Sequence, residues 1–397
     1  MASPGWWTIL VMVLVAALFT RTYPLAVFAL MLAAVSAAAE WWRRRSLRGV
    51  TLRRLFTYRR GYPGESLTFK LELENRKLLP LPWLRVLDLV PYDVAPADPS
   101  QVIATHMPDT GMLLSLFSLR WYQRDRRAFT LLLRRRGIYR IGPPRLESGD
   151  LFGLFQEASD DGPQDLVTVF PQPLEFSELG LPSADPFGDQ RARRRLYDDP
   201  TRVIGVREYR PEDDFRRVHW PATAHTGDLQ VKLYQPVSAR LVVLCLNVLT
   251  LPHYWEGTDP ELLEYLVSVT ATLAQRGLQD GFRVGLVSNA SLAHADQPFR
   301  VPPGRSKAQF SQLLIALAGV TPFVTGPFDR FLMREAPRLP YGATLVIITG
   351  LLDDAIAEAV LRLRRSGRRV LLLHFGQKRP PDLPGVEVVF RPFHHKH

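Results

Sequence analysis

Cysteine is almost absent from this chain of 397 residues, in which Cys245 stands alone. A single cysteine excludes an internal disulfide framework and is compatible with a reducing compartment. Cys245 lies inside the apolar run Leu241–Leu246. Because such a run is typical of a buried strand, we expect its thiol to be a core side chain rather than a catalytic nucleophile.

The chain also lacks the short motifs that mark common active sites. There is no serine elbow, no glycine-rich phosphate loop and no cysteine–histidine set. The nearest candidates for acid–base or metal chemistry are Asp213, Asp214, His219 and His225. Their spacing fits no metal-ligand pattern, such as two histidines four residues apart on a helix. We therefore expect a protein that is not an enzyme and needs no cofactor.

Acidic residues are fewer than basic ones. The 39 Asp and Glu face 50 Lys and Arg, a formal net charge of +11. This balance favours an anionic partner, either a membrane surface or nucleic acid. The basic run 191–195 lies in a stretch rich in Pro, Gly and Asp, and is interpreted as solvated linker or as a contact for acidic lipid or an acidic partner. No recognition helix or stacking platform accompanies it, so nucleic acid is not expected.

Two uncharged apolar segments, 6–19 and 25–39, lie near the N-terminus. Each is slightly shorter than the roughly 20 residues that span a bilayer core, but flanking Trp and Tyr residues at the interfaces lengthen both. We expect a transmembrane hairpin of two spans with its tip at Arg21–Pro24; one broken span and a cleaved signal peptide are the alternatives. A signal peptide is disfavoured because no Lys or Arg precedes the apolar run.

A basic cluster follows directly, formed by Arg43, Arg44, Arg45 and Arg48. The positive-inside rule keeps such a cluster cytoplasmic. Both termini and the soluble domains should therefore lie in the cytoplasm. The cluster also stands where anionic lipid would attract it.

The middle region, 49–170, has the pattern of a strand-rich domain. Leu67, Phe69, Leu71 and Leu73 alternate with polar residues, as in a half-buried strand. Several short strands, Pro-rich turns and no helical period favour a β-sandwich. Residues 171–200 are expected to be a linker.

The remainder, 201–397, alternates strands and helices. Apolar strand patterns at 240–246, 282–287, 343–349, 369–374 and 386–390 are separated by helical periods at 259–276, 306–318 and 353–365. This alternation is typical of a doubly wound parallel α/β sheet.

The most individual stretch of the chain is Gly205–Trp220, in which half of the residues are charged. Four arginines balance four acids, and Gly, Pro and aromatic residues surround them. Because disordered tails are usually of one sign and lack aromatics, we expect an ordered, ion-paired loop between two strands. The residues expected to form this signature loop are Arg207, Tyr209, Pro211, Asp213, Asp214, Arg216, His219 and Trp220.

This stretch resembles the signature of a bacterial family, domain-of-unknown-function family fifty-eight. Further segments similar to that family are Tyr62–Glu65, Arg136–Tyr139 and Gly149–Phe155. In the last of these, Leu151 replaces the usual proline. The resemblance implies a protein anchored in a bacterial inner membrane, with a von Willebrand factor A-like domain. It also implies an adaptor or assembly role alongside a MoxR-type ATPase of the AAA+ class.

Von Willebrand factor A-like domains often hold a divalent cation through an Asp-x-Ser-x-Ser run and later Thr and Asp residues. Here Asn247, Leu249 and Leu251 occupy the positions of that run. Hard cations need charged oxygen ligands, so the site is degenerate. Thr349 and Asp353 could mimic the later ligands, but a helix N-terminus explains them more simply. We expect no bound metal.

Two roles for the signature loop stay open beside a disfavoured catalytic one. In the structural role, Arg207, Asp213, Asp214 and Arg216 form ion pairs that fix the loop to the α/β domain, with Trp220 packed beneath. In the interaction role, the loop presents Arg and aromatic anchors to a partner.

The sequence thus predicts a membrane-anchored adaptor or assembly factor, with residues 1–48 as anchor and basic flank. It would bind the lipid bilayer and a protein partner. The alternatives are a divalent-cation-dependent adhesion or hydrolytic module and a purely structural membrane scaffold, which would have no ATPase partner.

Overall fold

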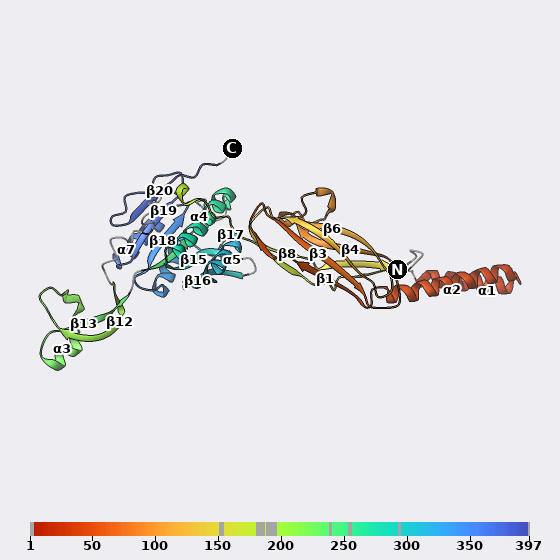
Figure 1. Cartoon of the computed structure of the whole chain (residues 1–397), viewed down its shortest axis with the longest axis horizontal. Helices are drawn as coiled ribbons and strands as arrows, with labels where there is room; N and C mark the ends of the chain where they lie inside the picture. Colours follow the sequence, from red (N-terminus) through yellow and green to blue (C-terminus); the bar gives the residue numbers. More distant parts are fainter. Residues whose placement is uncertain are drawn as a thin grey trace. The chain divides into compact units, whose positions relative to one another are not determined.

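The structure, a computed structural model, describes residues 4–150, 155–179, 187, 197–237, 240–252, 256–292 and 295–395. The chain divides into two compact units, Met1–Phe170 and Pro171–His397 (Figure 1). Two features singled out in the sequence, the basic run 191–195 and the segment 151–154 with Leu151, lie outside the described residues.

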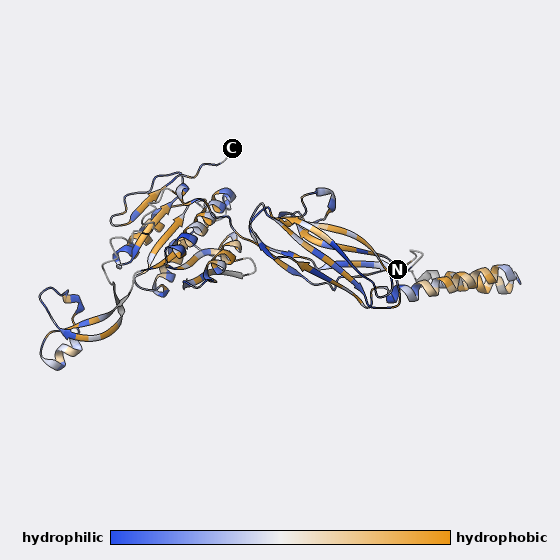
Figure 2. Cartoon of the chain, viewed as in Figure 1, coloured by the Kyte–Doolittle hydropathy of each residue, from blue (hydrophilic) through white to orange (hydrophobic). Residues whose placement is uncertain are grey.

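The first unit opens with the helices α1 (Pro4–Phe19) and α2 (Tyr23–Ser46). Among the described residues, α2 alone is long and apolar enough to cross a membrane, and only 17% of its most apolar window is buried. Its apolar side chains are therefore mostly exposed, unlike those of a core helix. Figure 2 shows that apolar residues predominate along this helix. The 16 residues of α1 fall short of the roughly 20 that span a bilayer, and the expected second span stays a prediction.

The rest of this unit is built from strands. They form the sheets β1-β3-β7, β10-β9-β4-β6-β5 and β2-β11-β8. Their bounds, with those of two short 3-10 helices, are β1 (Val50–Phe56), β2 (Arg60–Gly61), β3 (Ser66–Asn75), β4 (Leu81–Pro91), η1 (Tyr92–Val94), η2 (Pro99–Gln101), β5 (Val102–Ala104), β6 (Thr110–Leu119), β7 (Arg124–Leu132), β8 (Gly137–Ile141), β9 (Pro144–Gly149), β10 (Gln156–Ser159) and β11 (Asp165–Val169).

The core of this unit confirms the alternation seen in the sequence. In β3, Leu67, Phe69, Leu71 and Leu73 are each at most 1% exposed. They share one hydrophobic cluster with residues of the other sheets, such as Val86 in β4. Successive side chains of a strand point to opposite faces, so the apolar face of β3 covers this cluster.

A buried ion-pair network joins the three sheets. Arg54 of β1 donates to both carboxylate oxygens of Asp88 in β4, at 2.7 and 2.8 Å, and to Asp165 of β11 at 2.9 Å. The Arg54 side chain is fully buried. Because a buried charge is stable only when it is paired and hydrogen-bonded, the network requires the three sheets to meet in register.

The second unit contains a seven-stranded sheet of order β16-β15-β14-β18-β19-β20, with β17 paired to β15. The neighbouring strands β15, β14, β18, β19 and β20 pair parallel to one another. Strands β16 and β17 pair antiparallel to β15. The bounds are η3 (Phe176–Leu179), β14 (Leu241–Leu246), α4 (Pro260–Gln279), β15 (Arg283–Leu292), β16 (Ala295–Gly304), α5 (Gln309–Ala318), β17 (Val320–Val324), α6 (Phe328–Glu335), η6 (Ala336–Arg338), β18 (Thr344–Thr349), α7 (Asp354–Arg365), β19 (Arg369–His374) and β20 (Glu387–Phe390).

Helices cover this sheet on both faces. Val243 and Cys245 of β14 share a hydrophobic cluster with α6 and α7. Val242 and Leu244, which point to the opposite face, are also fully buried, and α4 contacts the same strand. Cys245 is thus the core side chain that the sequence predicts. The described residues form a mixed α/β protein with several sheets and one N-terminal apolar helix long enough to span a membrane.

A separate two-stranded ribbon carries the charged block. β12 (Tyr197–Glu208) and β13 (Gln230–Val237) pair antiparallel and join no other sheet in the described part of the chain (Figure 1). Between them lie the short helices η4 (Phe215–Arg217) and α3 (Trp220–Thr226). The ordered loop between two strands is therefore present. We call residues 203–234 the arm.

Candidate functional site

Local capping explains why the arm folds between its strands. The Asp214 carboxylate accepts a hydrogen bond from Arg216 N at 3.0 Å and so caps η4. His219 Nδ1 accepts from Ala222 N at 3.1 Å and caps α3. Gly227 ends α3 with a φ of +82°, a conformation that favours glycine. Side chains that satisfy orphan backbone donors fix both helix starts.

A bidentate ion pair closes the turn that follows β12. Arg207 Nη1 and Nη2 donate to the two carboxylate oxygens of Asp213 at 2.6 and 2.5 Å. Asp213 also accepts from Arg210 N at 2.9 Å, across a turn that includes the exposed Pro211. The hydrogen bond from Arg207 lowers the pKa of Asp213, and the same bond raises the pKa of Arg207. We call this pair the clamp.

The interior of the arm is very small. Val218 and Val231 are 3% and 2% exposed and pair across a β-bridge. His219 N donates to Gln230 O at 2.7 Å, and Tyr209 N donates to Leu229 O at 2.8 Å. With two buried valines, the arm depends on its hydrogen bonds and the clamp for its shape.

The outer surface of the arm is aromatic and charged. Tyr209, Phe215 and Trp220 form an edge-to-face chain with ring-centroid separations of 6.1 and 5.9 Å. Phe215 and Trp220 are 56% and 59% exposed. Exposed apolar side chains that gather in one patch, rather than singly, are typical of interaction sites. We call these three residues the aromatic row.

The structure corrects part of the expected ion-pair pattern. Of the proposed pairs only Arg207 with Asp213 is present, because Asp214 is used as a helix cap. Within the described residues, Arg216 forms no ion pair and is exposed. Trp220 lies on the surface rather than beneath the loop. The hydrogen bonds of the clamp stay inside the arm, so the clamp shapes the arm and does not attach it to the seven-stranded sheet.

Sequence reasoning missed Phe215, the residue that joins Tyr209 to Trp220. The signal was the recurrence of aromatics at positions 209, 215 and 220 within a charged block. It was not recognised because the interval fits neither a helical nor a strand period.

The predicted degenerate cation site lies at the carboxyl ends of the parallel strands and is a closed hydrogen-bond network. Asn247 Nδ2 donates to Thr349 Oγ1 at 3.0 Å, and Asn247 Oδ1 accepts from Asn289 Nδ2 at 3.2 Å. Asn247 Oδ1 also accepts from Leu249 N at 3.1 Å. Asn247, Asn289 and Thr349 are fully buried. We call these three side chains the amide network.

The oxygens that would face a cation are therefore already engaged. Asp353 caps α7 by accepting from Ile356 N at 2.8 Å, and Leu251 is a half-buried apolar side chain. Among the described residues, no three His, Cys, Asp or Glu side chains gather as metal ligands. A neutral network of this kind offers little to a hard cation, which prefers carboxylates.

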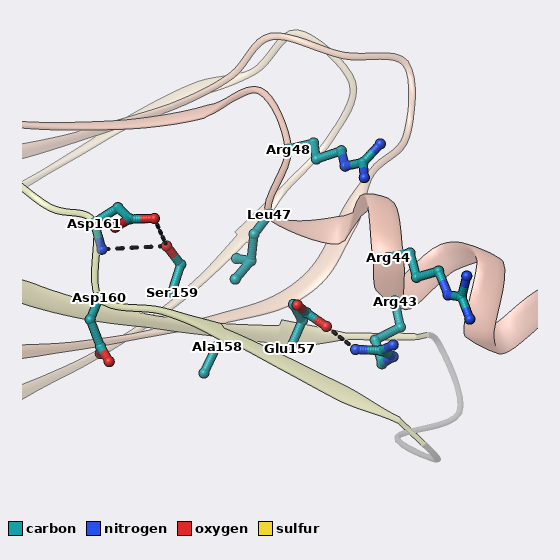
Figure 3. Close-up of a pocket in the computed structure, with 9 residues that line it drawn as sticks. All are labelled: Arg43, Arg44, Leu47, Arg48, Glu157, Ala158, Ser159, Asp160 and Asp161. Atoms are coloured by element: carbon teal, nitrogen blue, oxygen red, sulfur yellow. Dashed lines mark hydrogen bonds and ion pairs between the residues drawn. The ribbon is translucent and has the colours of Figure 1, made fainter. Parts of the chain in front are cut away.

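The basic cluster at the end of α2 splits into two pairs. Arg43 and Arg44 both bond Glu40, at 2.7 and 2.8 Å, and Arg43 also pairs with Glu157 of β10. Figure 3 shows this ion pair at the edge of a recess of about 590 Å³ that Asp160 and Asp161 also line. The charges on this side of the helix are thus largely compensated.

Arg45 and Arg48, the other pair, line a second recess. Arg45 lies over the ring of Trp41, 4.6 Å from its centroid, and Arg48 is exposed. Lys77 Nζ donates to the carbonyl oxygens of Ser46 and Arg48 at 2.6 and 2.8 Å. It therefore caps the C-terminal end of α2, where cations are favoured. Burial lowers the pKa of Lys77 to about 8.

Comparison with known proteins gives one curated relative at low identity and distant structural likenesses. The protein described as Uncharacterized protein YeaD, from Bacillus subtilis, is 21% identical over 338 residues, 83% of this chain and 76% of that protein. A CARDB domain from Pyrococcus furiosus is 13% identical, covers 30% of this chain and 91% of its own, and has a TM-score of 0.22. Sporulation control protein Spo0M from Bacillus subtilis is 11% identical, and the match covers 30% of this chain and 49% of that protein with a TM-score of 0.19. TM-scores this low support no argument about fold or function.

A family match covers most of the second unit. Residues 205–390 match the family described as Protein of unknown function DUF58. The matched range includes the charged block of the arm and the whole seven-stranded sheet. Residues 205–390 are thus the part of the chain that is similar to DUF58 domains.

Proposed function

We propose that the protein is a membrane-anchored adaptor or assembly factor that docks a protein partner through its arm. In this proposal α1 and α2 form a two-span hairpin in a bacterial inner membrane, with both termini and the soluble domains in the cytoplasm. The strand-rich domain is a β-sandwich, and the seven-stranded domain is von Willebrand factor A-like. The outward-facing apolar surface of α2 and the arginines at its end support the anchor.

The aromatic row is the observation that carries the proposal. Exposed Phe215 and Trp220 lie beside Arg210 and Arg216, which are exposed and form no ion pair among the described residues. Trp, Tyr and Arg are the residues that dominate binding energy at protein interfaces, where a polar rim surrounds them. The clamp holds these side chains in place before binding, which reduces the entropy lost on docking.

Two observations favour binding over catalysis. The chain's one cysteine is buried, and burial raises the pKa of Cys245 to about 12, so its thiolate is scarce at neutral pH. The amide network engages the oxygens that a cation-dependent module would need. The resemblance to family fifty-eight suggests a MoxR-type AAA+ ATPase as the partner.

A pull-down with the detergent-solubilised full chain and a MoxR-type ATPase from the same organism tests the proposal. Replacing Phe215 and Trp220 with Ala should weaken capture by about 30-fold or more, as expected for a hot spot. Arg216→Glu should weaken it as well, whereas Arg379→Glu, an equal charge change at an exposed loop residue of the same unit, should not. Equal capture by all variants, each with Cys245 still protected from thiol reagents, would reject the arm as the docking site.

Calorimetry separates this proposal from the cation-dependent alternative. We expect no saturable heat on titration with Mg²⁺, Mn²⁺ or Ca²⁺, because the candidate oxygens are already hydrogen-bonded. Saturable binding that is lost in Asp353→Ala would favour the adhesion or hydrolytic module instead. A folded chain that captures no ATPase at all would favour the purely structural scaffold.

A further inference from the structure

One end of the strand-rich domain lies directly beside the end of α2. Lys77, in the loop between β3 and β4, bonds the carbonyl of Ser46, the last residue of α2, and that of Arg48 just beyond it. Arg76 N donates to Gly49 O at 2.9 Å. The neighbouring loop between β6 and β7 is tied to this one, because Tyr122 N donates to Lys77 O at 3.2 Å. Asn75 Nδ2 reinforces the connection by donating to Leu79 O and to Arg120 O, both at 2.9 Å.

These two loops expose large apolar and aromatic side chains. Leu78 is 73% exposed, Trp121 is 62% exposed and Tyr122 is 64% exposed. Trp41, on the adjoining face of α2, is 50% exposed. Trp and Tyr with solvent-exposed rings are typical of the headgroup level of a bilayer, where one part of the ring is apolar and the other hydrated.

The depth of these residues follows from the length of α2. About 20 residues at 1.5 Å each cross the roughly 30 Å hydrocarbon core. A span that begins at Tyr23 is therefore complete near Trp42, which leaves Arg45 and Arg48 at the headgroup level. Lys77 and Leu78 lie at the same level, because Lys77 is bonded to the end of the helix.

The recess between these elements carries uncompensated positive charge. Its volume is about 540 Å³, and Trp41, Arg45, Arg48, Lys77, Leu78 and Leu79 line it. No carboxylate lines it, in contrast to the recess of Figure 3, where Glu157, Asp160 and Asp161 face the arginines. Arg45 and Arg48 form no ion pair within the described residues. Three basic side chains and no carboxylate give this recess a positive potential, which favours an anionic ligand.

We propose that this end of the strand-rich domain rests on the bilayer surface, with Leu78, Trp121 and Tyr122 in the interface and an anionic phospholipid phosphate in the recess at Arg45, Arg48 and Lys77. A lipid is favoured over a soluble anion because Trp41 of α2, a helix with many exposed apolar side chains, lines the recess. Basic pockets beside the cytoplasmic ends of spans are established sites for anionic headgroups. This inference depends on α2 crossing the bilayer and is independent of the arm.

Spin labels on the full chain in nanodiscs containing phosphatidylglycerol test the placement. Cys245 is buried and unreactive, so labels can be attached at Leu78→Cys and Trp121→Cys without removing it. Phe28→Cys, at a 63% exposed position of α2, reports whether α2 is in the bilayer, and Ile103→Cys is the matched exposed apolar control. Ile103 pairs with Met112 near the start of β6, at the strand end opposite Trp121.

Oxygen and nickel accessibilities should place the labels at 78 and 121 in the interface and the label at 103 in water. Labels at 78 and 121 that are as water-accessible as the one at 103 overturn the proposal. A water-exposed label at 28 overturns it too, because α2 would then not cross the bilayer.

A lipid titration tests the recess itself. Phosphatidylglycerol is added to the detergent-solubilised chain, and native mass spectrometry gives the apparent dissociation constant of the first bound lipid. Each basic residue near an anionic surface contributes about fivefold, so Arg45→Gln with Arg48→Gln should weaken binding by roughly 25-fold. Arg53→Gln with Arg140→Gln, two exposed strand arginines of the same unit, is the control of equal charge. The site is overturned if both double variants weaken lipid binding equally, or if neither weakens it.

Discussion

At the scale of single residues, Asn247 determines the chemistry at the carboxyl ends of the parallel strands. A carboxylate at this position would be a metal ligand, but the amide both donates and accepts and so joins Asn289 to Thr349. The sequence predicted that the cation run is degenerate. It could not predict Asn289, because this partner comes from β15, 42 residues along the chain.

Replacing Asn247 with Leu should destabilise the second unit by roughly 2–4 kcal/mol, because several buried polar groups lose their partner. Urea unfolding followed by pulse labelling of Cys245 measures this change, since the thiol is accessible only after unfolding. Asp353→Asn, which keeps an oxygen to cap α7, is the milder control. A loss below about 1 kcal/mol in Asn247→Leu would show that the amide network contributes little.

His374 predicts a pH dependence for the same unit. Burial lowers the pKa of His374, whose Nε2 lies 3.0 Å from Lys378 O. The folded state therefore binds fewer protons than the unfolded state between the lowered pKa and the ordinary value of about 6.5. The free energy of unfolding is therefore highest above about pH 6.5 and falls as the pH drops through that window, by at most about 1.4 kcal/mol per pH unit from this one group.

The Cys245 labelling assay at pH 7.5 and pH 5.5 checks this expectation by comparing the wild type with His374→Gln. The free energy of unfolding should fall more steeply in the wild type as the pH is lowered. Equal slopes in the two proteins would contradict a neutral, buried His374.

At the scale of elements, the clamp should order the arm without supporting the rest of the unit. In Asp213→Asn, the backbone amides of residues 210 and 213 should exchange hydrogen faster, because the turn loses its charged acceptor. Hydrogen exchange with mass spectrometry measures this, with Glu358→Gln on α7 as the matched loss of an ion pair. Faster exchange throughout the seven-stranded sheet would contradict an arm that is shaped by its own bonds.

Local sequence patterns predicted many helices and strands, whereas features that depend on long-range contacts were not predicted. The alternation at Leu67–Leu73 predicted β3, and the apolar run at Leu241–Leu246 predicted β14. Asp353 was recognised as a helix start from its position before an amphipathic segment. The ion pairs of Arg54 with Asp88 and Asp165 could not be predicted from the sequence, because the three residues come from strands far apart in the chain.

At the scale of the whole molecule, sequence order predicted an apolar N-terminal segment, a strand-rich region and an α/β region, and each has its counterpart in the structure. That the apolar segment anchors the chain in a membrane stays a prediction. The second span, the cytoplasmic orientation and the identity of the partner stay predictions. No local pattern specifies them, because they depend on the membrane and on a second protein. The arm was predicted as a loop, but its exposed aromatic face depends on how η4 and α3 turn their side chains outward.

Site-specific photocrosslinking in living cells tests the docking claim most directly. A photoreactive phenylalanine analogue at position 215 of the full chain should form a covalent adduct with a MoxR-type AAA+ ATPase. Adding Arg216→Glu should strongly reduce that adduct, while Arg379→Glu leaves it unchanged. Absence of the ATPase adduct at position 215, or an adduct that Arg216→Glu does not affect, would contradict docking through the arm.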